Sequence, residues 1–469
     1  MSIDQKNDRN IDRNSDGKLC MSQHDLESVV NEFGSPLFVY DGDSIYESTK
    51  QVLKALSDQV GLFYSVKANP NIAICALLKE AGVNGAEVAS SGELLAAIES
   101  GFKPEQILFA GPGKTTDELE LAISLGVHQI NAESVTEIQR IESIASSLGN
   151  TQRVGVRVNP ESSSSGQGKI LTAGGPRKFG IDESKVSQAV TLITQSSHLE
   201  FAGLHTMLGS QVLDAQVMIE SCNAAIEMSI RIANQSGSHI PSLNFGGGLG
   251  AAHTDDDQQF DVIRFSNDLE SIVRAARQHP ELADCKFMIE PGRALVSEHG
   301  VYLARVIDRK ESCGQTFAIL DGGIHHALLP ITANAYRITN ASRPDISRKN
   351  NTPVHPENAA QSESKNVILG GPLCTSADQW RSQVHLPGFQ IGDVIAMHNS
   401  GAYGLTASMN MFLSRGIPAE VLIHQDHCYL IRERSRPTDF LMGQHIPQHI
   451  PQQKPAHTAQ DLDTRFQHD

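Results

Sequence analysis

SLNFGGGLG (residues 242–250) and KFMIEPGR (286–293) are short apolar segments that each end in glycine and polar residues. Six further segments of this kind precede them: LFYSVKAN (62–69), GAEVAS (85–90), ILFAGPG (107–113), HQINAE (128–133), RVGVRVNP (153–160) and FAGLHTMLGSQ (201–211). Between them lie stretches with helical spacing of apolar residues, several closed by glycine. Alternating strand and helix signals predict parallel βα units, and eight units predict an α/β fold built as a closed (β/α)₈ barrel.

The polar residues at the ends of these segments indicate a functional site. In a barrel of parallel strands the active site lies at the carboxyl ends of the strands. Any one polar residue there is explained by the polarity of loops. Several at the ends of successive strands favour a shared site, and they are Lys67, Glu87, Arg157, His205, the glycines 246–248 and Glu290.

Composition limits the function classes. The chain has 469 residues, which suits two domains, with 39% hydrophobic and 20% charged residues. No apolar run is long enough to cross a bilayer, and the polar first residues lack the apolar core of a signal peptide, so we expect a cytoplasmic protein. The net charge of −16 argues against nucleic acid and anionic membranes as partners. Seven scattered cysteines without CxxC spacing predict neither a disulfide framework nor a metal site.

Domain boundaries follow from the change of periodicity. We expect the barrel over residues 37–295 and a mostly β domain over 296–435, where VYLARVID, QTFAILDGG, NVILGG, DVIAMHNSG and AEVLIH have the pattern of strands. Residues 1–36 are expected to contribute a segment that packs on the β domain. The apolar-poor stretch 341–366 is interpreted as a mobile insert, and the Gln/His/Pro-rich stretch 443–469 as a disordered tail.

Three features together indicate one cofactor. Bare backbone N–H groups in the turn FGGGLG can cradle a phosphate, and barrel phosphate sites often follow strands seven and eight. Glu290 and Arg293 of EPGR lie beside that turn; an arginine suits phosphate and a carboxylate suits a protonated pyridine nitrogen. Lys67 at the end of the first strand is a candidate for a covalent imine with an aldehyde. Lysine, phosphate cradle and acidic partner are what pyridoxal 5'-phosphate requires.

Nine motifs in order resemble one family. They are YSVKAN, EVASSGEL, VRVNP, KFGI, HTMLGSQ, NFGGGLG, EPGR, GPLCTSAD and SGAYG, and they span roughly residues 35 to 425. The chain resembles the fold type III pyridoxal-phosphate decarboxylases, which include the diaminopimelate, ornithine and arginine decarboxylases. The C-terminal domain would then resemble the β domain of alanine racemase, and the activity would be that of a carboxy-lyase acting on an amino acid.

The resemblance implies roles for single residues. Lys67 would be the Schiff-base lysine, His205 would stack on the cofactor ring and Glu290 would pair with the pyridine nitrogen. Cys374 would come from the neighbouring subunit of a homodimer and protonate the carbanion left by carbon dioxide, which a thiol can do near neutral pH. Glu87 and Arg157 are further candidates for binding the cofactor. The phosphate would be held by Ser210, Gly246, Gly247, Gly248, Gly292, Arg293 and Tyr403.

The candidate substrate-binding residues are Arg293, Thr375, Leu329 and Tyr403, and two of them depart from the family pattern. Thr375 stands where diaminopimelate decarboxylases usually have a glutamate for the distal ammonium, and Leu329 where they have an arginine for the distal carboxylate. A site without those charges favours an amino-acid conjugate. An atypical branch fits this, with decarboxylases of carrier-protein-bound glutamate, exosortase-linked enzymes and decarboxylases of siderophore biosynthesis. Diaminopimelate decarboxylation and amino-acid racemisation on the same barrel stay open as alternatives.

Overall fold

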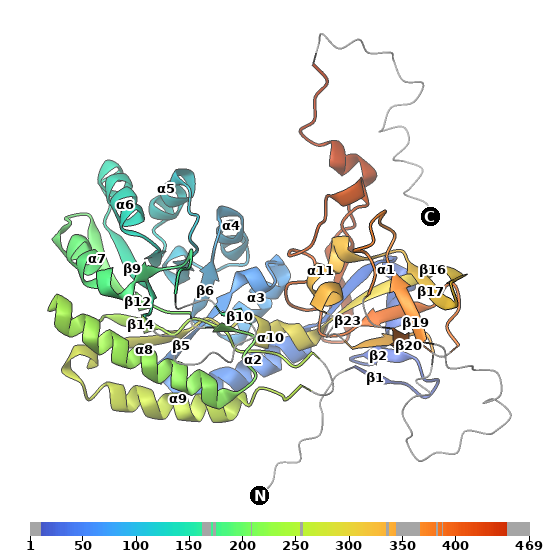
Figure 1. The fold of residues 1–469 in the computed structure, drawn as a ribbon, viewed down its shortest axis with the longest axis horizontal. Helices are drawn as coiled ribbons and strands as arrows, with labels where there is room; N and C mark the ends of the chain where they lie inside the picture. The colour runs from blue at the N-terminus through green and yellow to red at the C-terminus, as the bar shows by residue number, and fades with distance from the viewer. Residues whose placement is uncertain are drawn as a thin grey trace, which may run out of the picture. The chain divides into compact units, whose positions relative to one another are not determined.

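A computed structural model describes residues 11–161, 170–171, 175–207, 209–253, 257–333, 337–343, 366–380, 383–386 and 388–447. The chain divides into two compact units (Figure 1). One unit is Gly42–His299, and the other combines the chain up to Asp41 with the chain from Gly300 onward. The sequence had placed this boundary at residues 37 and 295.

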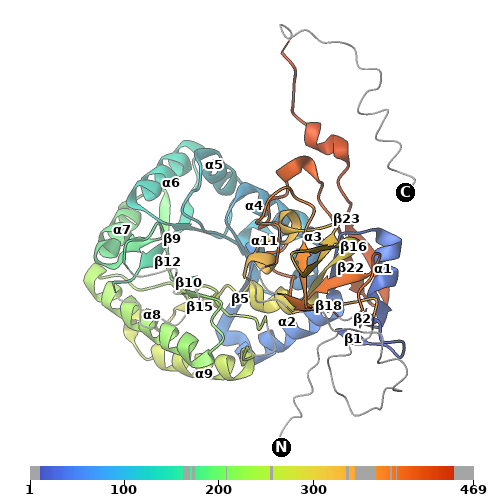
Figure 2. The same ribbon diagram turned by 45° about the vertical axis from the view of Figure 1, so that its right-hand side comes forward.

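The unit Gly42–His299 is a closed barrel of eight parallel strands, which confirms the predicted fold class (Figure 2). Each strand pairs with the next along the chain, and β15 closes the circle by pairing with β5. Each of the eight apolar segments found in the sequence overlaps one barrel strand. The strands are β5 Val60–Ser65, β6 Gly85–Val88, β7 Ile107–Phe109, β8 Gln129–Ala132, β9 Gln152–Asn159, β12 Leu199–His205, β14 Ser242–Asn244 and β15 Lys286–Ile289.

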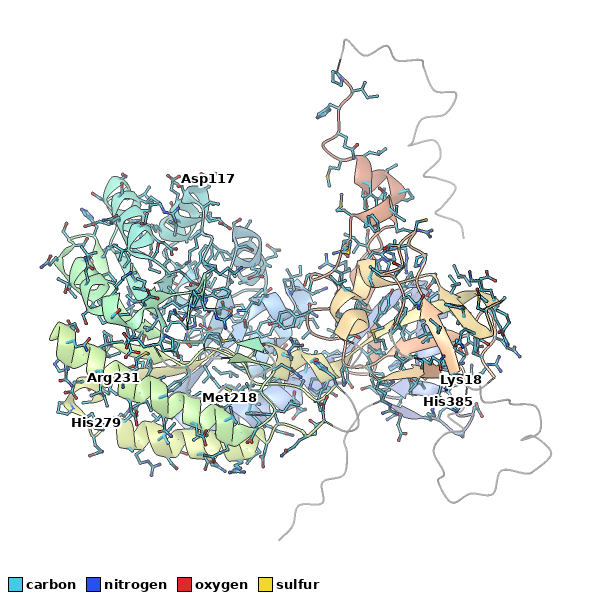
Figure 3. All side chains as sticks on the ribbon, viewed as in Figure 1. Lys18, Asp117, Met218, Arg231, His279 and His385 are labelled. Atoms are coloured by element: carbon cyan, nitrogen blue, oxygen red, sulfur yellow. The ribbon has the colours of Figure 1, made fainter. Side chains whose placement is uncertain are left out.

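Helices surround this barrel, and local signals set their ends. Asn71 caps the first turn of α3 by accepting from the N–H of Ala73, and Gly82 ends that helix in the left-handed conformation. On α8 the side chain of Met218 is buried, whereas Arg231 lies on the outside (Figure 3). The helices are α2 Gly42–Leu56, α3 Ile72–Ala81, α4 Ser91–Glu99, α5 Thr116–Leu125, α6 Val135–Leu148, α7 Glu183–Gln195, α8 Ala215–Ser236, α9 Val262–Ala276 and α10 Arg293–Val296.

The other unit is mostly β, as the sequence predicts. Its main sheet has the order β20-β19-β17-β16-β4-β22-β23, with β21 and β18 branching from β16. The strand β4 (Leu37–Asp41) pairs with β16 and β22, so the segment just before the barrel belongs to this unit. The other strands are β16 Gly300–Ser312, β17 Gln315–Leu320, β18 Ile338–Asn340, β19 Asn366–Gly370, β20 Val384–His385, β21 Val394–Met397, β22 Ala419–His424 and β23 His427–Arg432.

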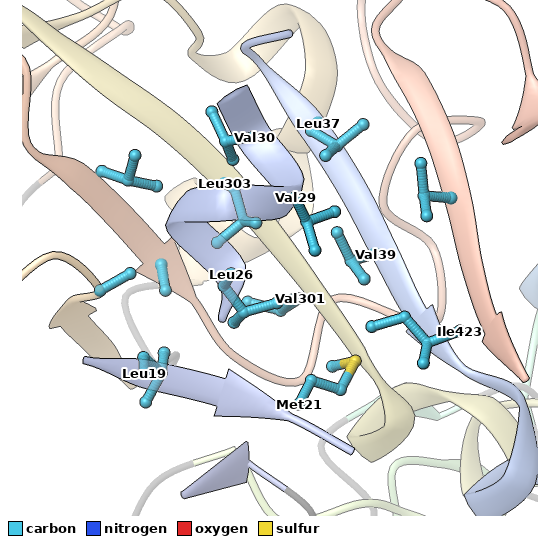
Figure 4. Close-up of a cluster of buried hydrophobic side chains, with 14 of the residues drawn as sticks. Leu19, Met21, Leu26, Val29, Val30, Leu37, Val39, Val301, Leu303 and Ile423 are labelled. Carbon is cyan, nitrogen blue, oxygen red and sulfur yellow. The ribbon is translucent and has the colours of Figure 1, made fainter. Parts of the chain in front are cut away.

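An apolar cluster holds the N-terminal segment on this sheet (Figure 4). Leu26, Val29 and Val30 on helix α1 (Leu26–Phe33) pack with Val301 and Leu303 of β16. Strands β1 Ile11–Arg13, β2 Leu19–Met21 and β3 His24–Asp25 form a small sheet beside α1, and Leu19 and Met21 join the cluster. Segments that precede and follow the barrel in the sequence therefore share one apolar core.

Parts of two sequence-based expectations lie outside the described residues: 344–365 of the insert and 448–469 of the tail. Among the residues that the structure describes, no helix is both long and apolar enough to span a membrane.

Candidate active site

Lys67 and Glu87 meet at the ends of neighbouring barrel strands. Lys67 lies in the single turn η2 (Val66–Ala68) that follows β5, and Glu87 lies on β6. The Lys67 Nζ atom is 2.6 Å from Oε2 of Glu87, and the Ser65 hydroxyl donates to the same oxygen at 2.5 Å. The Glu87 side chain is 3% exposed and that of Lys67 is 39% exposed. The amine is thus aimed by a buried carboxylate and open to a ligand.

Glu290 is the second buried carboxylate of the site. Its Oε1 accepts a hydrogen bond from Asn244 Nδ2 at 2.6 Å, and its Oε2 lies 3.2 Å from Nε2 of His205. Burial alone would raise the pKa of Glu290, but the His205 imidazole, the Lys67 charge and the Asn244 amide outweigh burial and hold this pKa below its usual value. The carboxylate is therefore kept ionised inside the barrel mouth.

The glycine turn after β14 packs closely against Glu290. Gly246 and Gly248 have φ of +75° and +100°, a region that favours glycine. A Cβ atom on Gly247 would collide with the Glu290 carbonyl oxygen, and one on Gly246 with that of Thr206. The Gly246 carbonyl accepts from the Glu290 N–H at 2.8 Å. No side chain larger than glycine fits this turn.

Arg157 belongs to a separate ion-pair network on the barrel rim. Its Nη1 lies 2.8 Å from Glu133 Oε1, and its guanidinium lies 4.6 Å from the ring centre of Phe179. The other Glu133 oxygen accepts from the N–H of Gly180 at 2.7 Å. The carboxylate therefore fixes Arg157 and joins the end of β8 to the KFGI segment.

Lys114 is a second lysine near this rim, and its environment differs from that of Lys67. Its ammonium is fully buried and is hydrogen-bonded at 2.8 Å to the carbonyls of Gly111 and Asn131 and to the carboxylate of Glu137. All three donors are used, so Lys114 has a structural role. The half-exposed Lys67 is the lysine suited to chemistry.

Cys374 lies on an exposed loop of the other unit. The loop is closed by Asp378, whose carboxylate accepts from the N–H groups of Ile324 and Leu373, both at 2.8 Å. The Thr375 hydroxyl accepts from the N–H of Ala377 at 3.3 Å. This unit also carries Tyr403, with φ of +53°.

Several sequence-predicted residues fall at one end of the barrel. The structure brings Lys67 to Glu87, and His205 to Glu290, and it places Gly292 where an added Cβ would press on Ser65 and Ala68. Ser210 lies on the two-residue strand β13 (Gly209–Ser210). Cys374, Thr375, Leu329 and Tyr403 are in the β unit; Leu329 is in helix α11 (Ile324–Ala333).

Sequence reasoning missed Asn244, Glu133 and Ser65. Each lies in one of the sequence segments quoted above, but the side chain that it contacts in the structure comes from another strand. Asn244 touches Glu290 from 46 positions away, and Glu133 touches Arg157 from 24 positions away. A polar residue at the buried end of a predicted strand was the available signal.

The described residues fit pyridoxal phosphate. A partly exposed lysine, an ionised buried acid and a glycine turn lie at the ends of β5, β15 and β14. His205 is buried, and among the described residues neither of its ring nitrogens makes a hydrogen bond of regular geometry. A buried imidazole in that state is costly alone and indicates a ligand-binding environment.

Comparison with known proteins agrees with this geometry. The family model "Pyridoxal-dependent decarboxylase, pyridoxal binding domain" matches residues 42–297. L-glutamyl-[BtrI acyl-carrier protein] decarboxylase of Niallia circulans is 33% identical over 91% of this chain and 97% of its own length. Diaminopimelate decarboxylase of Zymomonas mobilis is 31% identical over 91% and 96%. The crystal structure of M. jannaschii diaminopimelate decarboxylase with L-lysine has a TM-score of 0.80 and 28% identity, covering 94% of this chain and all of that one.

Proposed function

The chain belongs to the pyridoxal-dependent decarboxylases, and we propose that its substrate is an amino acid held as a conjugate without a free distal ammonium. Enzymes of this family are lyases that use pyridoxal phosphate to remove carbon dioxide from amino acids. The bound cofactor supplies an electron sink for the electron pair that the departing carbon dioxide leaves behind. The chain's own residues must hold the cofactor, orient the substrate and return a proton.

In this proposal each residue has one task. Lys67 attaches the cofactor, with Glu87 and Ser65 aiming its amine. Glu290 pairs with the pyridine nitrogen. Cys374 of a second subunit delivers the proton to the substrate carbon, so that a homodimer with shared sites is the active form. The glycine turn, Ser210, Gly292, Arg293 and Tyr403 would hold the phosphate.

The charge of the Cys374 loop carries the substrate proposal. Residues 371–377, GPLCTSA, contain no charged side chain. The first carboxylate after these residues belongs to Asp378, which is 3% exposed. It already accepts hydrogen bonds from the backbone N–H groups of Ile324 and Leu373. A distal ammonium would find no carboxylate to pair with in this loop, and an unpaired charge in a binding site is strongly rejected.

A substrate panel tests the proposal. Rates of carbon dioxide release would be compared for meso-diaminopimelate, free glutamate and a glutamyl thioester of pantetheine, because one relative acts on a carrier-bound glutamate. We expect kcat/KM for the thioester to exceed that for diaminopimelate by at least about a hundredfold. Thr375→Glu should lower the ratio of these two kcat/KM values, because it places a carboxylate in the loop that can pair with the distal ammonium of diaminopimelate. Faster turnover of diaminopimelate by the unchanged protein would reject the conjugate.

The alternative substrate is diaminopimelate itself, which the names of the Zymomonas mobilis and M. jannaschii relatives favour. These two relatives are 31% and 28% identical to this chain, and the carrier-protein enzyme is 33% identical to it. Identity at this level does not separate the two substrates, and the same panel decides between them.

A further inference from the structure

Glu290 is held from two sides by side chains of neighbouring strands. Asn244 ends β14 and His205 ends β12, and these strands are adjacent in the barrel. Asn244 is 0% exposed, His205 2% and Glu290 4%. Each carboxylate oxygen of Glu290 therefore has its own partner, since Asn244 takes Oε1 and His205 lies against Oε2.

We propose that Asn244 and His205 are positioning residues that hold Glu290 as an anion in one orientation, aimed at the cofactor's ring nitrogen. This rests on the proposed role of Glu290 and adds a contact with Glu290 to the expected stacking of His205 on the cofactor ring. The contact of His205 is one of proximity, because its geometry is not that of a regular hydrogen bond. The Asn244 amide supplies the directional bond.

Both partners favour the ionised form of Glu290. An amide N–H donates to a carboxylate but has no acceptor for the proton of a carboxylic acid at Oε1. Without these partners, burial would favour the neutral acid. The titratable groups acting on Glu290 are His205 and Lys67, and both lower its pKa. A neutral acid would give the ring nitrogen a weaker, uncharged hydrogen bond.

Asn244 also ties Glu290 to the glycine turn. Its Oδ1 accepts from the N–H of Gly246 at 2.9 Å while its Nδ2 donates to Glu290. The same glycine accepts from the Glu290 backbone N–H. One amide side chain thus fixes the spacing between the turn that would receive the phosphate and the acid that would receive the ring nitrogen.

The test is the affinity of the apoprotein for pyridoxal phosphate divided by its affinity for the 1-deaza analogue, in which carbon replaces the ring nitrogen. Titration followed by protein fluorescence gives both constants without turnover. We expect the wild-type ratio to fall about tenfold in Asn244→Asp and in His205→Leu, the difference between a charged and a neutral hydrogen bond. His205→Gln keeps an N–H donor and should recover part of the ratio.

Ser242→Ala is the matched control. Ser242 is also buried on β14, and its hydroxyl donates to the Ala202 carbonyl at 2.7 Å without touching Glu290. This variant loses a buried hydrogen bond and should keep the wild-type ratio. An equal fall in Ser242→Ala would show a general loosening of the barrel and would reject a positioning role.

Glu290→Gln separates the failure of this inference from the failure of the assignment beneath it. If Glu290→Gln lowers the ratio while Asn244→Asp, His205→Leu and His205→Gln leave it unchanged, Glu290 is the ring partner but needs no positioning. If Glu290→Gln leaves the ratio unchanged, Glu290 is not the ring partner, and both statements fall. If the wild-type protein binds pyridoxal phosphate and the 1-deaza analogue with equal affinity, Glu290 is likewise not the ring partner, and both statements fall.

Discussion

The amine of Lys67 lies 2.6 Å from Oε2 of Glu87, an oxygen that also accepts a hydrogen bond from Ser65. Lys67 lies in the turn that follows β5 and Glu87 lies on β6, and these adjacent strands pair through Ser65 and Glu87. The register of these two barrel strands therefore sets the position of Lys67. The buried carboxylate of Glu87 directs the flexible lysine side chain toward the barrel mouth.

Borohydride reduction of the holoenzyme should fix the cofactor on the peptide that contains Lys67. Lys67→Ala should abolish this labelling together with the visible absorption of the bound cofactor. Lys114 is the internal control, because its three donors are already bound inside the protein. A reduced adduct mapped to Lys114 or to any lysine other than Lys67 would overturn the assignment.

Glu290→Gln should retain the cofactor but turn over at least about a hundredfold more slowly, the effect of removing one preorganised charge from a buried site. The neutral amide cannot stabilise a positive ring as the carboxylate does. Glu200→Gln is the control, since Glu200 is exposed and pairs with Arg153 at the start of β9. Near-normal turnover in Glu290→Gln would refute the role of this carboxylate.

The barrel could be predicted because each strand is a local signal. A run such as SLNFGGGLG carries its own apolar core and its own glycine turn, and eight such runs leave few other folds. The partners inside the site could not be predicted, because they depend on closure. Asn244 reaches Glu290 only when β14 lies beside β15. The network of Glu133 and Arg157 likewise requires β8 beside β9.

Asp378→Asn should loosen the loop that carries Cys374. The carboxylate accepts two backbone N–H groups, whereas an amide has one acceptor oxygen, so that either Ile324 or Leu373 loses its bond. Rearrangement is restricted because Gly323 and Gly371 approach the carboxylate so closely that a Cβ would collide with it. We expect hydrogen exchange at these two amides to accelerate about tenfold or more.

The exposed Asp308 provides the control for that experiment, because it accepts only from the neighbouring Arg309 N–H in the described contacts. Asp308→Asn should leave exchange at Ile324 and Leu373 unchanged. Unaltered exchange in Asp378→Asn as well would mean that the carboxylate does not hold the loop.

His325 should make the β unit sensitive to acid. Its side chain is fully buried, and burial, followed by the charge of Arg415, lowers its pKa to about 4. In the unfolded chain the His325 imidazole takes up a proton near pH 6.5, whereas in the folded chain it stays neutral down to about pH 4. The contribution of the neutral His325 to folding stability is therefore full above pH 6.5 and declines as the pH falls toward 4. Between pH 7 and pH 5 this loss of folding stability amounts to about 2 kcal/mol.

Thermal unfolding of His325→Phe at pH 7 and pH 5 measures that contribution. The variant should lose less of its melting temperature on acidification than the wild type does. The exposed His427 serves as the control, and His427→Asn should keep the wild-type dependence. If His325→Phe and the wild type respond equally to pH, protonation of His325 is not what destabilises the fold.

The proposed shared site predicts complementation between two inactive proteins. If Cys374 acts in the site of its partner subunit, neither a Lys67→Ala nor a Cys374→Ala homodimer has a complete site. A mixed dimer has one site with both residues and one with neither. Random assortment makes about half of the dimers mixed, so activity should recover to about a quarter of the wild-type value.

Subunit exchange must be demonstrated for that result to count, and Cys374→Ala alone must be severely impaired. The two variants would be mixed in dilute denaturant, refolded with cofactor, and their mixed dimers measured by native mass spectrometry with one partner isotopically labelled. The doubly substituted Lys67→Ala, Cys374→Ala chain mixed with wild type is the control, because its mixed dimers contain one damaged residue in each site. If mixed dimers form and activity stays at the level of the single variants, Cys374 serves its own chain, and the proposal of a shared site fails.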